Sequence, residues 1–407
     1  MTDLRDIETP PPDWDPEADA PGAVPGGGVR GAHRQGEYAR LREECPVAYS
    51  DHHGGFYTLT RYADVREAAR DHKRFRSGQP FISAPGFNQS IPIGLNPPEH
   101  ATYRRMLNKY FVPARMEELE PRLRAYADEH LDGLLARGHG DWVSELASPL
   151  PARGLCALLG IPDEAWKEMV GHVETLDSLR DDPAKINEII FGLFAEQVER
   201  LVSERRARPR DPERDLISGV LAMEIDGRPL AHETVLAIGV QIIAAGHSTT
   251  TDGLSGAVYR LATNPDIQAR LRREPALIPT AIEEFLRLEI PLPEMGRTAG
   301  EDIDLHGRTI PAGCPVALNF GSANRDAVEF PNPEACIVDR EPNRHLSFGH
   351  GVHKCVGAPL GRLEIRVALE QLLSRTIDFE LDGRPEPRPA AFIGGFSTLP
   401  MRFNPTT

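Results

Sequence analysis

Apolar residues recur at helical spacing along most of the chain, and short strand-like runs interrupt them. The helical period predicts helices over residues 35–44, 62–71, 116–136, 142–159, 163–176 and 184–207, and a long helix from about 231 to 262. Short strands are predicted at residues 55–60, 303–305 and 315–318, where turn residues flank the apolar ones. The pattern therefore predicts many helices and few strands.

Composition narrows the class of protein. The 407 residues suffice for one large domain or two ordinary ones, and 40% hydrophobic with 26% charged residues is typical of globular proteins. The net charge of −15 argues against nucleic acid or an anionic membrane as the main partner. The five cysteines show no disulfide spacing, and no apolar run approaches the roughly 18 residues of a membrane helix. We therefore expect a cytoplasmic protein with no membrane anchor.

The beginning of the chain differs from the rest. Residues 1–28 are rich in proline, glycine and acidic side chains and carry little apolar periodicity. Such composition does not bury enough apolar surface to fold by itself. We expect a flexible tail over residues 1–28, followed by one folded domain over residues 29–407.

Cys355 lies in a glycine-rich stretch, residues 348–357, directly before a predicted helix. Free N–H groups and the positive end of the helix dipole favour a thiolate there, and the N–H groups that follow can hydrogen-bond the sulfur. Three interpretations are open: a buried structural thiol, a zinc site with His350 and His353, and an axial thiolate to haem iron. The zinc interpretation lacks the paired, spaced ligands that such sites usually bring.

This stretch matches the pattern Phe-x-x-Gly-x-His-x-Cys-x-Gly at Phe348, Gly351, His353, Cys355 and Gly357. In this the sequence resembles the cytochrome P450 family, and the resemblance spans roughly residues 30–405. It implies the mainly α, triangular cytochrome P450 fold with a small β lobe and one haem b (iron protoporphyrin IX). It also implies that Cys355 is the iron ligand, that Phe348 shields the sulfur and that His353 binds a haem propionate.

Other haem contacts follow from the same resemblance. His100 and Arg104 are four residues apart, so they share one face of a helix that begins near Pro97 and Pro98. The resemblance implies that both residues, and Arg297 farther along the chain, bind haem propionates.

The long predicted helix contains an unusual central segment. Ala245 and Gly246 are followed by Ser248 and Thr249, and glycine and threonine are poor helix formers. A threonine hydroxyl can bond the carbonyl one turn back and open the helix locally. The segment resembles the family's oxygen-activation pattern, with Thr249 as the alcohol, but Ser248 stands where an acid is usual. This departure puts proton delivery by a carboxylate, and ordinary monooxygenation, in doubt.

Glu284 and Arg287 lie on one face of a predicted helix, which alone is typical of many surface helices. Arg344 stands where the family places the third member of a buried Glu-Arg-Arg cluster. The resemblance therefore implies a structural cluster behind the haem.

Residues of the loop 78–98, the long helix and the later extended segments are candidates for a substrate pocket. They are Ile82, Phe87, Ile91, Ile238, Gln241, Ile242, Pro293, Met295 and Phe396. A role in the core is an equal alternative for most of them. Gln241 is the one polar side chain on the haem-facing side of the long helix, either orienting a substrate or pairing with another helix.

The resemblance implies a monooxygenase that inserts one oxygen atom from O2 into a small, mainly apolar substrate. Nothing in the chain resembles a flavin or nicotinamide domain, so we expect electrons from an external ferredoxin and ferredoxin reductase. A basic patch of Arg105, Lys109, Arg344, Lys354 and Arg362 is the expected docking surface. Oxidative coupling, peroxide-driven oxidation and a non-enzymatic haem-thiolate sensor remain alternatives.

Overall fold

The computed structural model describes residues 12–14, 31–83, 90–178, 190–388 and 394–406. The first helices are α1 (Gly31–Glu44), α2 (Tyr62–Arg70), α3 (Glu99–Asn108), α4 (Pro113–Arg137), α5 (Pro149–Leu159), α6 (Trp166–Ser178) and α8 (Ala195–Ala207). The later ones are α9 (Leu216–Leu221), α10 (His232–Ala262), α11 (Pro265–Arg273), α12 (Ile278–Leu288), α13 (Phe320–Ala323) and α14 (Ala358–Arg375).

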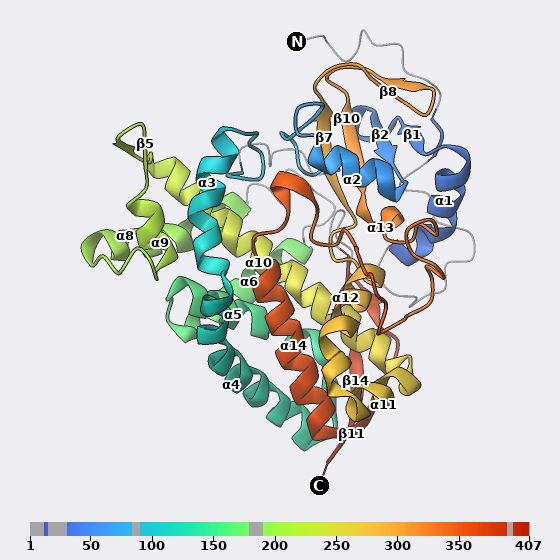
Figure 1. Ribbon diagram of the computed structural model, residues 1–407. Coiled ribbons are helices and arrows are strands. Elements are labelled where there is room, and N and C mark those ends of the chain that lie inside the picture. The colour runs from blue at the N-terminus through green and yellow to red at the C-terminus, as the bar shows by residue number, and fades with distance from the viewer. Residues whose placement is uncertain (1–11, 15–30, 84–89, 179–189, 389–393, 407) are drawn as a thin grey trace.

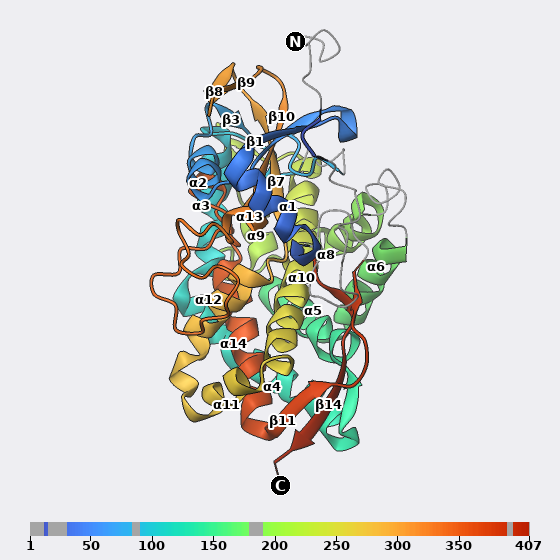
Figure 2. The ribbon, with the colours of Figure 1, turned by 90° about the vertical axis from the view of Figure 1, so that its right-hand side faces the viewer.

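The long helix α10 is the axis of a helical body. It contacts α5, α8, α12 and α14, and Figure 2 shows it running lengthwise among them. Most of its central and C-terminal residues are buried, polar as well as apolar, because other helices surround it. Gly246 lets α5 approach closely, since a Cβ there would lie 2.8 Å from Leu155 Cδ2. The predicted long helix is thereby confirmed.

A β lobe lies beside this body, at the top of Figure 1. Its five-stranded sheet has the order β1 (Val47–Ser50), β2 (Phe56–Leu59), β10 (Pro315–Asn319), β7 (Glu294–Ala299) and β3 (Phe75–Arg76). β10 runs parallel to β2, pairing Val316 with Tyr57, and antiparallel to β7, pairing Val316 with Arg297. The sheet thereby fixes the position of Arg297.

Smaller sheets complete the lobe and the opposite end of the molecule. They comprise β8 (Ile303–Leu305) with β9 (Arg308–Ile310), β11 (Thr376–Leu381) with β14 (Pro400–Pro405) and β4 (His139–Asp141), β12 (Glu386–Pro387) with β13 (Phe396–Thr398), and β5 (Glu224–Ile225) with β6 (Arg228–Pro229). A mainly helical fold with small sheets, as the resemblance implied, is confirmed.

Two predicted helices differ in detail. The one predicted over residues 142–159 is a π-helical turn, Val143–Ala147, followed by α5. Pro149 stands at the first position of α5, where a proline lacks the N–H that would continue the preceding helix. Of the helix predicted over 184–207, residues 184–189 lie outside the described residues, and the rest consists of a second π-helical turn, Ile190–Phe194, followed by α8.

Asp13 and Trp14 lie against the sheet, although they belong to the segment expected to be a tail. Asp13 N–H donates to Tyr49 O at 2.8 Å, and Tyr49 N–H donates to Asp13 Oδ2 at 2.7 Å. Trp14 is 6% exposed and packs edge-on against Tyr38 and Phe56. The division into a tail and one folded domain otherwise stays a prediction.

Within the described ranges, no helix has both the length and the apolar character needed to cross a membrane.

Candidate functional site

Cys355 lies in the loop between a short 3-10 turn, Gly351–His353, and α14. Its N–H donates to Phe348 O at 2.8 Å, which closes the loop. Gly351 has φ +68°, and a Cβ there would lie 2.4 Å from Ala69 O on α2. Only glycine satisfies both conditions, so the glycine pattern of the sequence fixes the loop against α2.

Cys355 is an exposed residue of the loop, although its thiol is surrounded by protein atoms. Burial raises the pKa of its thiol, while the N–H groups of Gly357 and Ala358 and the Arg104 guanidinium lower it, and the net pKa is raised. The helix N-terminus alone therefore does not make the thiolate that the sequence predicted. A bound metal cation would, because coordination deprotonates a thiol outright.

A zinc site at this loop does not fit the geometry. His353 Nε2 lies 2.8 Å from Ser77 Oγ, and the His353 ring packs on His100 with 4.2 Å between ring centroids. Over the part of the chain that the structure describes, no three His, Cys, Asp or Glu side chains are grouped so as to hold a metal ion. The haem interpretation of Cys355 is the one that the site supports.

Four potential cations gather beside this loop: His100, Arg104, Arg297 and His353. Burial lowers the pKa of Arg297 to about 10. Burial first, and then nearby guanidinium groups, lower the pKa of His100 to about 4 and that of His353 to about 2. Among the described residues none of the four forms an ion pair with an acid, although His100 and Arg297 are only 2% and 5% exposed. The two histidines are therefore neutral near pH 7, whereas a buried guanidinium such as that of Arg297 needs an anionic partner. The carboxylates of haem propionates fit the arginines as ion-pair partners and the histidines as hydrogen-bond partners.

The middle of α10, residues 245–251, is the second part of the candidate site. Thr249 is half-buried and its hydroxyl donates to Ala245 O at 2.8 Å, while Ala245 is exposed. Thr250 and Thr251 make the same bond to Gly246 and His247, at 3.2 Å and 3.1 Å. The back-bonding predicted for this segment is therefore present. Gly246 faces Leu155 instead, so it is a packing residue between α10 and α5.

α14 passes directly against this part of α10. A Cβ on Gly361 would lie 3.8 Å from Thr250 Oγ1, and the two helices contact each other. Because Cys355 precedes α14 by three residues, the sulfur and the threonine segment lie on adjoining elements.

The carboxylic acid that the resemblance implies beside the Thr249 hydroxyl is absent, because residue 248 is a serine. Ser248 is buried, with 8% of its surface exposed. Its neighbour His247, which the sequence analysis passed over, does not replace it. His247 Nε2 donates to Ser148 O at 2.9 Å, and burial lowers the pKa of the imidazole to about 4. His247 is therefore neutral near pH 7, and its side chain is hydrogen-bonded to Ser148.

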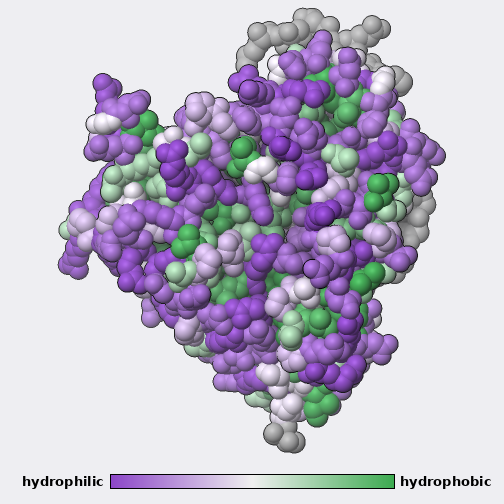
Figure 3. All heavy atoms as spheres, viewed as in Figure 1, coloured by the Kyte–Doolittle hydropathy of each residue, from purple (hydrophilic) through white to green (hydrophobic). Residues whose placement is uncertain are grey.

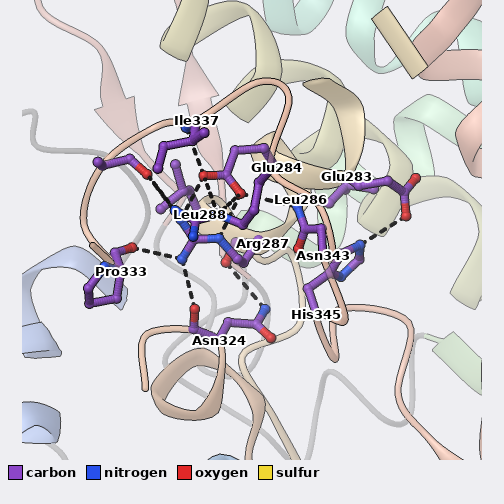
Figure 4. A network of polar contacts seen from close by, with 12 residues as sticks. Glu283, Glu284, Leu286, Arg287, Leu288, Asn324, Pro333, Ile337, Asn343 and His345 are labelled. Carbon is purple, nitrogen blue, oxygen red and sulfur yellow. Dashed lines mark hydrogen bonds and ion pairs between the residues drawn. The ribbon is translucent and has the colours of Figure 1, made fainter. Parts of the chain in front are cut away.

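Glu284 and Arg287 form a buried bidentate pair on α12, shown in Figure 4. The third arginine, however, is Arg340, whose Nε lies 3.0 Å from Glu284 Oε2. Arg344, the predicted member, is 65% exposed and lies 3.6 Å from Glu329. The prediction is wrong at this position because the segment is not helical. Its turn brings the Ile337 N–H and Arg340 to the same carboxylate.

The nine predicted pocket residues do not share one environment. Ile238 and Ile242 on α10 and Met295 on β7 are buried, while Gln241 and Pro293 are half-buried. Phe87 lies outside the described residues.

Three of the predicted pocket residues pack elsewhere. Ile82 lies against the aromatic cluster around Trp14, and Ile91 against the main core. Phe396 is 1% exposed and stacks on Tyr259 at 5.1 Å. These contacts assign Phe396 to the core, and a substrate role for the others stays a prediction.

The face that carries α3 and α14 is turned toward the viewer in Figure 3, where apolar patches lie among hydrophilic side chains. Three residues of the predicted basic patch pair with acids. Lys109 lies 2.7 Å from Glu213, Arg362 2.7 Å from Glu283, and Arg344 binds Glu329. Arg105 and Lys354 are exposed, and no ion pair is found for either among the described residues. The patch is therefore smaller than the sequence suggested.

Comparison with known proteins agrees with this geometry. A family model described as Cytochrome P450 matches residues 170–404. The chain is 35% identical to the mycinamicin IV hydroxylase/epoxidase of Micromonospora griseorubida, over 90% of this chain and 94% of that protein. It is also 35% identical to the vitamin D(3) 25-hydroxylase of Pseudonocardia autotrophica, over 90% of this chain and 93% of that protein.

Solved structures give the same result. CYP108D1 from Novosphingobium aromaticivorans superposes with a TM-score of 0.82 at 30% identity, covering 91% of this chain and 94% of that one. CYP109E1 from Bacillus megaterium in complex with testosterone superposes with a TM-score of 0.81 at 30% identity, covering 91% and 97%.

Proposed function

The chain belongs to the cytochrome P450 family and is a P450 monooxygenase, and from this we propose a specific reaction. It inserts one oxygen atom from O2 into a small, mainly apolar organic substrate, with haem b as cofactor. Electrons come from an external ferredoxin and its reductase in the cytoplasm.

One observation carries the proposal. The Cys355 sulfur, with the N–H groups of Gly357 and Ala358 directed at it, lies in the loop beside His100, Arg104, Arg297 and His353, which have no acidic partner among the described residues. A haem bound here supplies oxygen-activating chemistry through its thiolate-ligated iron. Cys355 would be the ligand, the two N–H groups would tune the donation of its electrons, and Arg104 and Arg297 would hold the carboxylates of the group.

The helix α10 provides the remaining functions. Thr249 and Ser248 hold hydroxyl groups where protons are needed, and Ile238 and Ile242 exclude water. Gln241, half-buried on the same helix, offers one polar contact to a substrate. The named relatives are hydroxylases of mycinamicin IV and vitamin D(3), which supports hydroxylation of an organic substrate.

Electron delivery requires a docking surface. Arg105 and Lys354, exposed on the face of α3 and the Cys355 loop, suit a small acidic ferredoxin. Arg66 and Arg70 on α2 extend this basic surface, since α2 contacts the same loop.

The test begins with the reduced protein under carbon monoxide. We expect the red-shifted Soret band of thiolate ligation, and we expect Cys355→His to retain haem but lose that band. A histidine-type band in the wild type would show that the assignment of Cys355 is wrong. Cys336→Ser is the matched control, because Cys336 lies outside the loop and should leave the band unchanged.

Ser248 favours a second candidate, a peroxide-driven or coupling enzyme that needs no carboxylate beside the alcohol. Product formation with the reductase system supports the monooxygenase, and product formation with peroxide alone supports the second candidate. Absence of product from both, with the thiolate band intact, favours a haem-thiolate sensor.

A further inference from the structure

The carboxylate missing at position 248 is present one turn farther along α10, at Asp252. Residues 241, 248 and 252 are spaced by seven and four, so Gln241, Ser248 and Asp252 lie along one face of the helix. Asp252 is 1% exposed and Ser248 8% exposed. Side chains four residues apart on a helix have Cβ atoms about 5–6 Å apart, which one water molecule can bridge.

Asp252 is held from outside the helix by the hairpin of β12 and β13. Arg388 Nη1 lies 3.5 Å from Asp252 Oδ1, and Arg388 is 4% exposed. The Arg388 N–H donates to Gly395 O at 2.9 Å, which closes the hairpin. Both residues of β12, Glu386 and Pro387, are exposed, so the chain passes from solvent to the buried ion pair within two residues.

Gly395 fixes the carboxylate further. Its φ is +105°, and a Cβ there would lie 2.2 Å from Asp252 Oδ1, so only glycine allows this approach. Next to it, Phe396 stacks on Tyr259 of α10 at 5.1 Å. The hairpin therefore packs against α10 at the position of the Asp252 carboxylate.

Stability alone is a poor reason for such a pair. Buried ion pairs gain little over well-packed apolar residues, because taking both charges out of water is costly. A position one turn from an oxygen-activation segment that lacks its acid offers a chemical reason instead.

Two other buried groups are poorer sources of protons. His247 lies about 100° around the helix from Ser248 and already donates to Ser148 O. Glu364 on α14 is directed at α5, since a Cβ on Gly154 would lie 2.1 Å from Glu364 Oε1.

We propose that Asp252, held by Arg388, delivers protons to the threonine segment through Ser248. The inference rests on the proposed monooxygenase function. In each transfer the Asp252 carboxylate takes up one proton from solvent at the hairpin and passes one to Ser248 Oγ, directly or through one water, while the Ser248 hydroxyl proton passes on beside Thr249. Asp252 is then again the carboxylate paired with Arg388, so no net charge accumulates. Because Asp252 acts through Ser248, it is a positioning residue and not a catalytic one.

The test uses the full-length haem protein with its reductase system. Asp252→Asn keeps the shape of the side chain, and we expect product formed per reductant consumed to fall sharply. The rate of the proton-dependent step should fall roughly 10²-fold, at the low end of what positioned acids supply. The same variant should shift the C–O stretching band of the reduced carbon monoxide complex, which reports hydrogen bonding in this segment without turnover.

A second carboxylate distinguishes proton delivery from a structural role. Ser248→Glu placed in the Asp252→Asn background should restore coupling, because it puts an acid next to Thr249. A purely structural Asp252 would not be rescued in this way. Ser248→Ala leaves the pair of Asp252 and Arg388 intact. We expect this variant to lower coupling as much as Asp252→Asn does. The double variant should show no further loss of coupling, because both residues act in the same transfer.

Coupling and C–O band unchanged in Asp252→Asn would overturn the inference. So would a loss that Ser248→Glu does not rescue, or wild-type coupling in Ser248→Ala. If Asp252→Asn fails to fold, Ser248→Ala alone decides. A wild type that lacks the thiolate band, or that forms no product with the reductase, would instead contradict the proposed function.

Discussion

Glu284 accepts hydrogen bonds from Nε and Nη2 of Arg287, both at 2.8 Å, and neither side chain has any exposed surface. Arg287 also donates to the carbonyl groups of Asn324 and Pro333, so the pair ties α12 to the irregular segment before the Cys355 loop. Breaking one partner of a buried pair leaves an uncompensated charge, which typically costs about 3–5 kcal/mol. We expect Glu284→Gln to lower the free energy of unfolding by that order, measured by urea titration.

Arg340 and Arg344 provide a matched comparison for the same cluster. Arg340 donates to Glu284, whereas the Arg344 side chain is 65% exposed. Arg340→Ala should therefore destabilise the protein by about 1.5–3 kcal/mol, and Arg344→Ala should stay within about 0.5 kcal/mol of the wild type. The reverse order of the two variants would contradict the cluster as described.

The contrast between these two arginines shows what the sequence was able to predict. The spacing of Glu284 and Arg287 was sufficient to predict that they pair, because on a helix two residues three positions apart lie on the same face. Residues 331–347 have no such period, so nothing in their order indicates which arginine turns inward. The structure decides it through the turn that also brings the Ile337 N–H to Glu284.

The same reasoning applies to the candidate site. The Cys355 loop and the threonine segment are local patterns, and each was found from the sequence. The pair of Asp252 and Arg388 joins positions far apart in the chain, and the packing of Phe396 on Tyr259 does the same. Contacts of this kind depend on how α10 and the hairpin pack, which no local period encodes.

Arg297 is a buried cation without an acidic partner among the residues that the structure describes, and burial lowers its pKa to about 10. A propionate would be its partner, so we expect Arg297→Gln to weaken haem binding by about 10- to 100-fold, the range of a hydrogen bond to a charged group. The haem-free variant should unfold at higher urea than the haem-free wild type, because the uncompensated charge is gone.

Both effects are measured on the same preparations, by haem transfer to apomyoglobin and by urea unfolding of the haem-free protein. Arg297→Lys is the control, since it keeps the charge and should bind haem more tightly than Arg297→Gln. Equal haem affinity in both variants would show that Arg297 does not contact the propionate.

His247 makes stability depend on pH. Its pKa is about 4 in the folded protein, because burial disfavours the imidazolium, against 6.5 for an ordinary histidine. A group whose pKa is lowered by folding contributes stability that is present above pH 6.5 and is lost as the pH falls from 6.5 toward 4. The loss amounts to about 3 kcal/mol. We expect His247→Gln to flatten the free energy of unfolding across this window.

His139→Gln is the control for that measurement, because His139 is exposed on β4. It should leave the pH dependence as it is in the wild type. His100 and His353, whose pKa values are also lowered, to about 4 and about 2, should preserve part of the slope in the His247 variant. A slope unchanged in His247→Gln would contradict a neutral His247.

Docking of an acidic ferredoxin is tested by reversing single charges. Arg105 is exposed, and no ion pair is found for it among the described residues, whereas Lys109 already pairs with Glu213 at 2.7 Å. Arg105→Glu should therefore slow ferredoxin-dependent reduction several-fold, and the slowing should disappear at high salt, which screens exposed charges. Lys109→Glu should act more weakly, and a rate unchanged in Arg105→Glu would exclude this surface.

Thr249 is the hydroxyl on which oxygen activation is expected to depend. It is half-buried beside the exposed Ala245, whereas Thr251 makes an equivalent bond to the carbonyl of His247 on a buried face. Thr249→Ala removes the hydroxyl that holds protons in this segment. We therefore expect reductant to be consumed at a similar rate while product falls and released peroxide rises. Thr251→Ala loses the same number of atoms and should keep the product yield of the wild type. Equal product yield in Thr249→Ala and the wild type, measured with one substrate and one reductase system, would show that oxygen activation in this protein takes a route that does not need Thr249.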